Sequence, residues 1–220
     1  PMRRLHPNPA ESVTIHECYD LPRHAHPGRP WVMLCMVSGL DGSTTVGSTS
    51  RGLSSATDQQ LLLTLRTFAD VILVGANTAR WEGYGPPKGT EQRVAVVSRT
   101  GDFDFSLPIW TSGRAVLLMP EDAPQVPVPS VRAGLGDVDL ARALASLDAR
   151  VVQAEGGPTL NGLLAAADLV DELNLTISPQ VTGGDGPRAV SGAPELPRRM
   201  HLAHVLEDAG FLFTRYVRRA

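Results

Sequence analysis

The chain has 220 residues, 42% of them hydrophobic, and carries a net charge of −3 at neutral pH. This length can bury one substantial core, while the absence of a long basic block or a membrane-length apolar run argues against nucleic-acid and membrane partners. Two cysteines, Cys18 and Cys35, do not make a disulfide framework, so the composition favours a cytoplasmic protein.

Residues 1–29 are rich in proline and histidine. We expect them to form an extended arm on the surface of a single domain that spans residues 30–220. His24 and His26 resemble half of a metal site, but no nearby cysteine or second histidine pair completes a tetrahedral set. The sequence therefore predicts no metal site.

Apolar runs alternate with helical patterns through the rest of the chain, as in α/β proteins. Five nearly continuous apolar runs predict strands that are buried on both faces of a parallel sheet. They span residues 31–38, 69–76, 93–98, 115–119 and 151–154. Three helical patterns lie at residues 56–68, 137–147 and 159–167. Residues 173–178 alternate apolar and polar side chains, which predicts a strand with one wetter face, and residues 211–217 predict a final antiparallel edge strand.

The stretch from 151 to 160 places a sharp turn between a strand and a helix. Glu155 ends the apolar run, Gly156 and Gly157 allow a tight turn, and Pro158 suits the first helical position. Backbone amides at the start of such a helix bind phosphate or pyrophosphate. On this stretch alone, an ordinary strand-to-helix turn is an equal alternative.

Polar side chains also follow the other predicted strands, at the edge of the sheet where α/β proteins bind ligands. Asp41 lies between two glycines after the first strand, and Arg80 follows the second. Ser98 and Arg99 follow the third, where they could hold the 2′-phosphate of NADP or form a plain polar turn. Arg66 lies near the end of the 56–68 helix, where a cation suits the helix dipole.

The order of these motifs resembles the pyrimidine reductases of riboflavin biosynthesis, the reductase domain of a bifunctional deaminase–reductase family. The resemblance implies a three-layer α/β fold like that of dihydrofolate reductase, with a mostly parallel sheet, antiparallel C-terminal edge strands and flanking helices. It also implies a homodimer, NADPH as the hydride donor, and 5-amino-6-(5-phosphoribosylamino)uracil as a substrate that accepts hydride at ribose C1′.

The resemblance assigns roles to individual residues. The catalytic carboxylates would be Asp41 and Glu155. The residues that grip the substrate phosphate would be Ser54, Arg66 and Arg80. The cofactor would be held by Gly75, Thr78, Ser98, Arg99, Gly156, Gly157, Thr159 and Leu160.

Several positions depart from the family pattern. Cys35 stands where the family usually has lysine, and Gly39 stands where it has serine. A dihydrofolate or pterin reductase and a catalytically silent NADPH-binding protein are therefore alternatives, although paired arginines favour a phosphorylated substrate. The zinc-deaminase motifs His-x-Glu and Pro-Cys-x-x-Cys are absent from the sequence, so we expect no deaminase activity.

Overall fold

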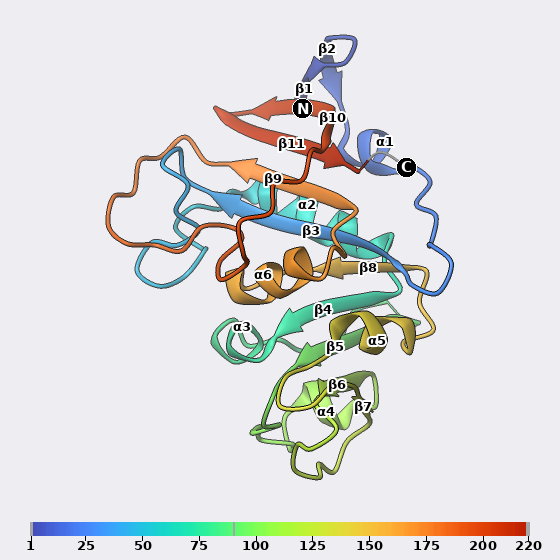
Figure 1. The fold of residues 1–220 in the computed structure, drawn as a ribbon. Coiled ribbons are helices and arrows are strands. Elements are labelled where there is room, and N and C mark those ends of the chain that lie inside the picture. Colours follow the sequence, from blue (N-terminus) through green and yellow to red (C-terminus); the bar gives the residue numbers. More distant parts are fainter. Residues whose placement is uncertain (1, 90, 219–220) are drawn as a thin grey trace.

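The computed structural model describes residues 2–89 and 91–218, which form one eleven-stranded sheet with helices on both faces (Figure 1). Seven neighbouring strands run parallel. In spatial order they are β9 (Glu172–Ile177), β3 (Trp31–Ser38), β8 (Val151–Ala154), β4 (Val71–Gly75), β5 (Arg93–Val97), β6 (Ala115–Met119) and β7 (Ser130–Arg132). Beyond β9 the sheet continues antiparallel through β11 (Phe211–Val217), β10 (His201–Asp208), β1 (Met2–His6) and β2 (Ala10–Val13).

Alternate side chains of the parallel strands pack on opposite faces of the sheet, and both faces are covered. This explains the continuous apolar runs of these strands. Val32 and Leu34 of β3 pack with α5 (Leu140–Ala145) and α6 (Pro158–Ala166) on one face. Met33 and Cys35 pack with α1 (Ile15–Tyr19) and α2 (Ala56–Thr67) on the other. The second face also carries α3 (Ala76–Trp81) and α4 (Pro108–Thr111). The expected three-layer α/β fold is confirmed.

The N-terminal residues do not form the expected extended arm. β1 pairs with β10 and β2 pairs with β1, so both strands extend the sheet. The final strand β11 is antiparallel, as expected. It does not lie at the edge of the sheet, because β10, β1 and β2 follow it in the strand order. The prediction of an edge strand was wrong because β10, β1 and β2, which lie beyond it, have no strong apolar run of their own.

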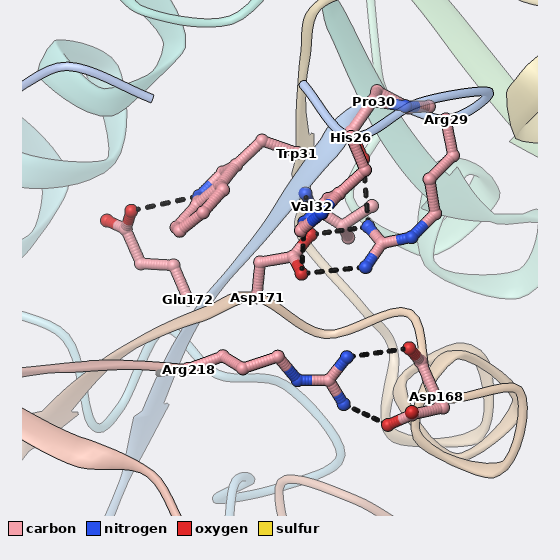
Figure 2. A network of polar contacts seen from close by, with 9 residues as sticks. All are labelled: His26, Arg29, Pro30, Trp31, Val32, Asp168, Asp171, Glu172 and Arg218. Atoms are coloured by element: carbon pink, nitrogen blue, oxygen red, sulfur yellow. Dashed lines mark hydrogen bonds and ion pairs between the residues drawn. The ribbon is translucent and has the colours of Figure 1, made fainter. Parts of the chain in front are cut away.

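Asp171 fastens the segment before β3 to the start of β9 (Figure 2). Its buried carboxylate accepts hydrogen bonds from both terminal nitrogens of Arg29 at 2.6 and 2.8 Å and from the backbone amide of Val32 at 2.9 Å. His26 Nε2 lies 2.9 Å from the same carboxylate. His26 therefore binds a carboxylate, consistent with a structural role rather than a metal pair with His24.

The polar side chains of β9 lie inside the protein. Glu172 is fully buried and binds Arg23 at 2.8 Å and Arg215 at 2.9 Å. Burial opposes its charge, but the two guanidinium groups prevail and lower the pKa of Glu172 to about 2. Asn174 and Thr176 are also buried, whereas the apolar side chains between them are half-exposed. The prediction that the polar face of this strand is the wetter one was wrong, because ion pairs with distant arginines allow it to be buried.

His204 of β10 should make the protein sensitive to mild acid. Burial, together with the charge of Arg215, lowers the pKa of His204 to about 4. Between pH 6.5 and 4 the unfolded chain therefore binds a proton that the folded protein excludes. As the pH is lowered through this range, the free energy of unfolding should decrease by at most about 3 kcal/mol. Denaturant unfolding at a series of pH values measures this slope. His204→Gln should flatten it between pH 6.5 and 5, above the range in which Glu172 titrates. Equal slopes in the variant and the wild type would contradict the assignment.

Candidate active site

A cleft of about 780 Å³ opens where the carboxyl ends of β3, β4 and β8 meet α2 and α3. Its floor is formed by residues 35–37 of β3 and by residues 155, 157 and 158 after β8. The loops 44–51 and 81–88 form its walls. This is the edge at which parallel sheets with crossover helices bind ligands, and it contains several of the residues singled out in the sequence.

A bidentate ion pair between Glu155 and Arg66 lines the cleft. Arg66 Nε and Nη2 each donate to a separate carboxylate oxygen of Glu155 at 2.7 Å. The Glu155 side chain is 2% exposed and that of Arg66 is 26% exposed. Burial works against the charge of Arg66, but Glu155 outweighs it, and the pKa of Arg66 is raised. The arginine is thus already neutralised by a carboxylate of its own chain.

Two further side chains hold Glu155 in place. The Tyr84 hydroxyl donates to Oε2, and Gln153 Nε2 donates to Oε1 at 3.0 Å. The Tyr84 ring also lies beneath the Arg66 guanidinium, 5.5 Å from its centroid. Burial raises the pKa of Tyr84, and the Glu155 charge adds to that rise, so the hydroxyl remains a donor. These contacts fix the orientation of the Glu155 carboxylate.

The glycine turn after β8 packs against the end of β4. Gly75 N donates to Gly156 O at 2.8 Å, and Gly156 adopts a positive φ of 80°, which glycine accepts without strain. The peptide bond between Gly156 and Gly157 is cis. A Cβ on Gly157 would lie 2.8 Å from Thr78 Oγ1. The turn therefore brings backbone close to Thr78, with no side chain at Gly157 to separate them.

The other residues expected to hold a cofactor lie in different surroundings. Leu160 is 4% exposed and belongs to the core under α6, while Thr159 is exposed at the second position of that helix. Ser98 is buried, and its hydroxyl accepts from the amide of Gly101 at 3.0 Å. Arg99 is largely exposed, 3.6 Å from Asp137. Ser98 and Arg99 lie at the end of β5 and do not line the cleft.

Arg80 and Asp41 also lie outside the cleft lining. Arg80 lies over the ring of Phe103, 4.3 Å from its centroid, and donates to a backbone carbonyl. Asp41 accepts from the amides of Gly183 at 2.7 Å and Thr182 at 2.8 Å. The Gly183 amide is the main cause of the lowered pKa of Asp41. The structure therefore brings Ser54, Arg66 and Glu155 together, but gives Arg80 and Asp41 other partners.

Sequence reasoning missed one carboxyl group of the cleft. Asp58, an acid in the first turn of α2, lines the cleft and is 9% exposed. Ser54 Oγ donates to its Oδ2 at 2.6 Å. Cys35 lines the same floor, and its thiol pKa is raised chiefly by burial and further by the nearby carboxylates of Asp58 and Glu155. The spacing of Ser54 and Asp58 at a helix start was the available signal, but it also fits simple capping.

A family model described as the RibD C-terminal domain matches residues 30–210. The chain belongs to this family. The chain is 29% identical over 185 residues to the 2,5-diamino-6-ribosylamino-4(3H)-pyrimidinone 5′-phosphate reductase of Methanothermobacter thermautotrophicus, an alignment that covers 74% of the chain and 83% of the archaeal protein.

Solved structures show the same RibD-type fold. A pyrimidine reductase-like protein of Corynebacterium diphtheriae superposes with a TM-score of 0.80 at 23% identity, covering 95% of this chain and all of that one. RibD of Acinetobacter baumannii gives 0.75 at 17% identity and covers 88% of this chain, which spans 59% of that protein. The riboflavin biosynthesis reductase of Saccharomyces cerevisiae gives 0.66 at 17% identity, with 94% and 92% covered.

Removal of Arg66 should destabilise the folded protein. Arg66→Ala leaves the Glu155 carboxylate buried without its counterion, and we expect a loss of about 3 kcal/mol in the free energy of unfolding, near the lower end for buried pairs because Arg66 is partly exposed. Urea denaturation measures the loss. The matched control is Arg51→Ala, which breaks an exposed pair with Glu82 and should cost less than about 1 kcal/mol. Equal losses in the two variants would show that the Glu155–Arg66 pair contributes no special stability.

Proposed function

We propose that the chain is an NADPH-dependent pyrimidine reductase of riboflavin biosynthesis. In this proposal it reduces a 6-(5-phosphoribosylamino)pyrimidine to the ribitylamino product by hydride transfer to ribose C1′. The observation that carries the proposal is that, in a chain of this family, the glycine turn after β8 and Glu155 line one cleft. The pyrimidine expected from the sequence is the 5-amino uracil, whereas the archaeal relative is named for a 2,5-diamino compound. The reduction at C1′ is the same for both.

The residues around the glycine turn fit a dinucleotide. Gly157, Pro158, Asn77 and Thr78 line the cleft, and the nine-residue helix α6 begins at Pro158. Backbone amides at a helix start suit a pyrophosphate, and the lack of a Cβ at Gly157 keeps that approach open. Thr159 at the same helix start would assist, while Gly75 and Leu160 would shape the turn by packing against it. Ser98 and Arg99 at the end of β5 would meet the 2′-phosphate that distinguishes NADPH from NADH.

NADPH would supply the hydride, and the chain's own residues would position the substrate and stabilise its charge. Opening of the ribosylamine ring gives an imine at C1′. Glu155, held as a buried carboxylate by Arg66, Tyr84 and Gln153, would stabilise the cationic form of that imine. Asp41 is the second expected catalytic carboxylate. Its contacts with residues 182 and 183 make it a support for the neighbouring loop in this structure.

The substrate phosphate needs cations that are not held by a buried carboxylate. Arg66 is paired with the buried Glu155, and Arg80 does not line the cleft. Arg51 and Lys88 line its walls. The pair of Arg51 with Glu82 is an exposed one at 3.4 Å, and within the described ranges no ion pair involves Lys88. We therefore place the phosphate near Arg51 and Lys88, with Ser54 also in the lining of the cleft. Arg66 would then contribute through Glu155 rather than as a direct phosphate ligand.

The proposal includes three properties of the whole protein. The chain would not deaminate its substrate, because the sequence has neither zinc-deaminase motif. It would act in the cytoplasm, since Cys18 and Cys35 are both free thiols, as is usual in a reducing compartment. It would form a homodimer through the apolar side chains of β9.

No helix in the described ranges is long and apolar enough to cross a membrane.

The apolar face of β9 supports the dimer. Leu173, Leu175 and Ile177 are only half-buried although they lie in the middle of the sheet. Sedimentation of the wild type should give a mass of twice 23.5 kDa. Leu175→Glu should shift it to the monomer, because a charge would be buried at the interface. Leu63→Glu, at an apolar residue of α2 that is 45% exposed, should leave the dimer intact. A monomeric wild type would overturn this part of the proposal.

Turnover separates the proposed function from its alternatives. The purified protein should oxidise NADPH, followed by its absorbance, when given a 6-(5-phosphoribosylamino)pyrimidine with either a carbonyl or an amine at C2. Oxidation with dihydrofolate alone would make the chain a pterin reductase. Cofactor binding without oxidation of any of the three would make it a silent homologue. Either result would sink the proposed function.

Preference for NADPH over NADH provides a second check. Arg99→Ala should reduce affinity for NADPH about tenfold or more, as expected for loss of a charge-assisted phosphate contact, and leave NADH binding unchanged. Fluorescence titration with each nucleotide measures both affinities. The control is Arg142→Ala, another exposed arginine paired with an acid, which should change neither. An equal loss for both nucleotides would place Arg99 outside the 2′-phosphate site.

A further inference from the structure

Asp58 differs from the other carboxylates of the cleft in having no cationic partner among the described residues. The cleft lining contains three acids, Asp58, Glu82 and Glu155. Glu155 is paired with Arg66, and Glu82 lies 3.4 Å from Arg51. In the part of the chain that the structure describes, no arginine, lysine or histidine nitrogen lies within 4.0 Å of Asp58. Asp58 as a whole residue is nevertheless only 9% exposed.

One oxygen of Asp58 is free to meet a ligand. Ser54 Oγ donates to Oδ2 at 2.6 Å, and no hydrogen bond from the described residues reaches Oδ1. The Thr176 hydroxyl is near enough to lower the pKa of Asp58 but makes no hydrogen bond of normal geometry. Because Asp58 lines the cleft and Oδ1 is not one of the fully buried atoms that lack a partner, a donor on a bound ligand can reach this oxygen.

Two hydroxyl contacts favour the charged, accepting form of Asp58 against the effect of burial. Burial raises its pKa above the usual value, while the Ser54 and Thr176 hydroxyls oppose the rise. Asp58 also lies in the first turn of α2, where the helix dipole favours a negative charge. The neighbouring thiol of Cys35 stays neutral because burial raises its pKa. The lysine usual in the family would put a cation at this point, so the change to Cys35 leaves the carboxylate free for substrate.

The two candidate pyrimidines differ in what they present to such a carboxylate. The diamino compound carries an amine at C2 beside the N3–H, so two donors lie side by side and match the two oxygens of a carboxylate. The uracil carries a carbonyl at C2, which would place an acceptor against a carboxylate oxygen. A site that hydrogen-bonds a substrate N–H discriminates strongly against an analogue that lacks it.

We propose that Asp58 recognises the 2-amino-4-oxo edge of the pyrimidine, so that the chain prefers the 2,5-diamino substrate to the uracil expected from the sequence. This inference rests on the proposed reductase function and names its substrate class. Hydrogen bonds to a charged acceptor are strong enough to give a preference of about ten- to a hundredfold. Dihydrofolate presents the same edge but carries no phosphoribosylamino group. Turnover of the diamino compound and of dihydrofolate therefore shows which of the two the site accepts.

The test compares kcat/KM for the diamino compound, the uracil compound and dihydrofolate with NADPH. The wild type should favour the diamino compound at least about tenfold over the uracil. Asp58→Asn replaces one acceptor by an amide donor, which complements the uracil edge, and should remove or invert the preference. The ratio is the decisive quantity, because a merely structural loss would lower both values together.

Glu82→Gln is the matched control, since it alters another carboxylate of the cleft that lies with Arg51 in the wall loops. It should leave the ratio of the two pyrimidines unchanged. Equal or greater turnover of the uracil by the wild type would overturn the role of Asp58 while leaving the reductase function in place, even if Asp58→Asn does not fold. A proportional loss for both pyrimidines in Asp58→Asn would also overturn it. Turnover of dihydrofolate alone would overturn the reductase proposal itself.

Discussion

The ion pair of Glu155 with Arg66 determines the shape of the cleft. It joins α2 to the end of β8, two elements that come from distant parts of the sequence. Transfer of two charges out of water is costly, and only good geometry with further hydrogen bonds offsets it. Here the geometry is bidentate, and Tyr84 and Gln153 bind the same carboxylate. Through Tyr84, the pair also holds the 81–88 wall against the floor.

The pattern of apolar residues predicted the parallel half of the fold well. The strand expected at 31–38 and the one at 211–217 have the observed bounds. β10 and the strands beyond it were missed because their exposed and buried residues do not alternate in a regular apolar pattern. The wrong face was assigned to β9 because the burial of Glu172 depends on Arg23 and Arg215, each far from it in sequence. Local periodicity contains no information on such partners.

The candidate site also combines features that the sequence could predict with features that it could not. The glycine turn and its approach to Thr78 were predictable, because they depend on the backbone freedom of neighbouring residues. The pairing of Arg66 with Glu155 was not, since it joins side chains 89 positions apart. The family resemblance assigned both residues to the substrate, and the structure shows that they also form a bidentate ion pair with each other. Asp58 was overlooked because an acid in the first turn of a helix already suits the helix dipole, so its position gave no separate sign of a ligand.

In the proposed reductase, this pairing separates the chemistry of the cleft from its choice of substrate. Hydride transfer would take place at C1′ beside Glu155, whose charge is balanced within the chain. The pyrimidine ring would meet α2 and β3, where no cation of the described residues pairs with Asp58 and Cys35 supplies none. A change at position 35 or 58 can therefore alter which ring is recognised without disturbing the group that acts at C1′. Members of one family could thus keep one reaction and differ in the pyrimidine they accept, because the two tasks depend on different carboxylates.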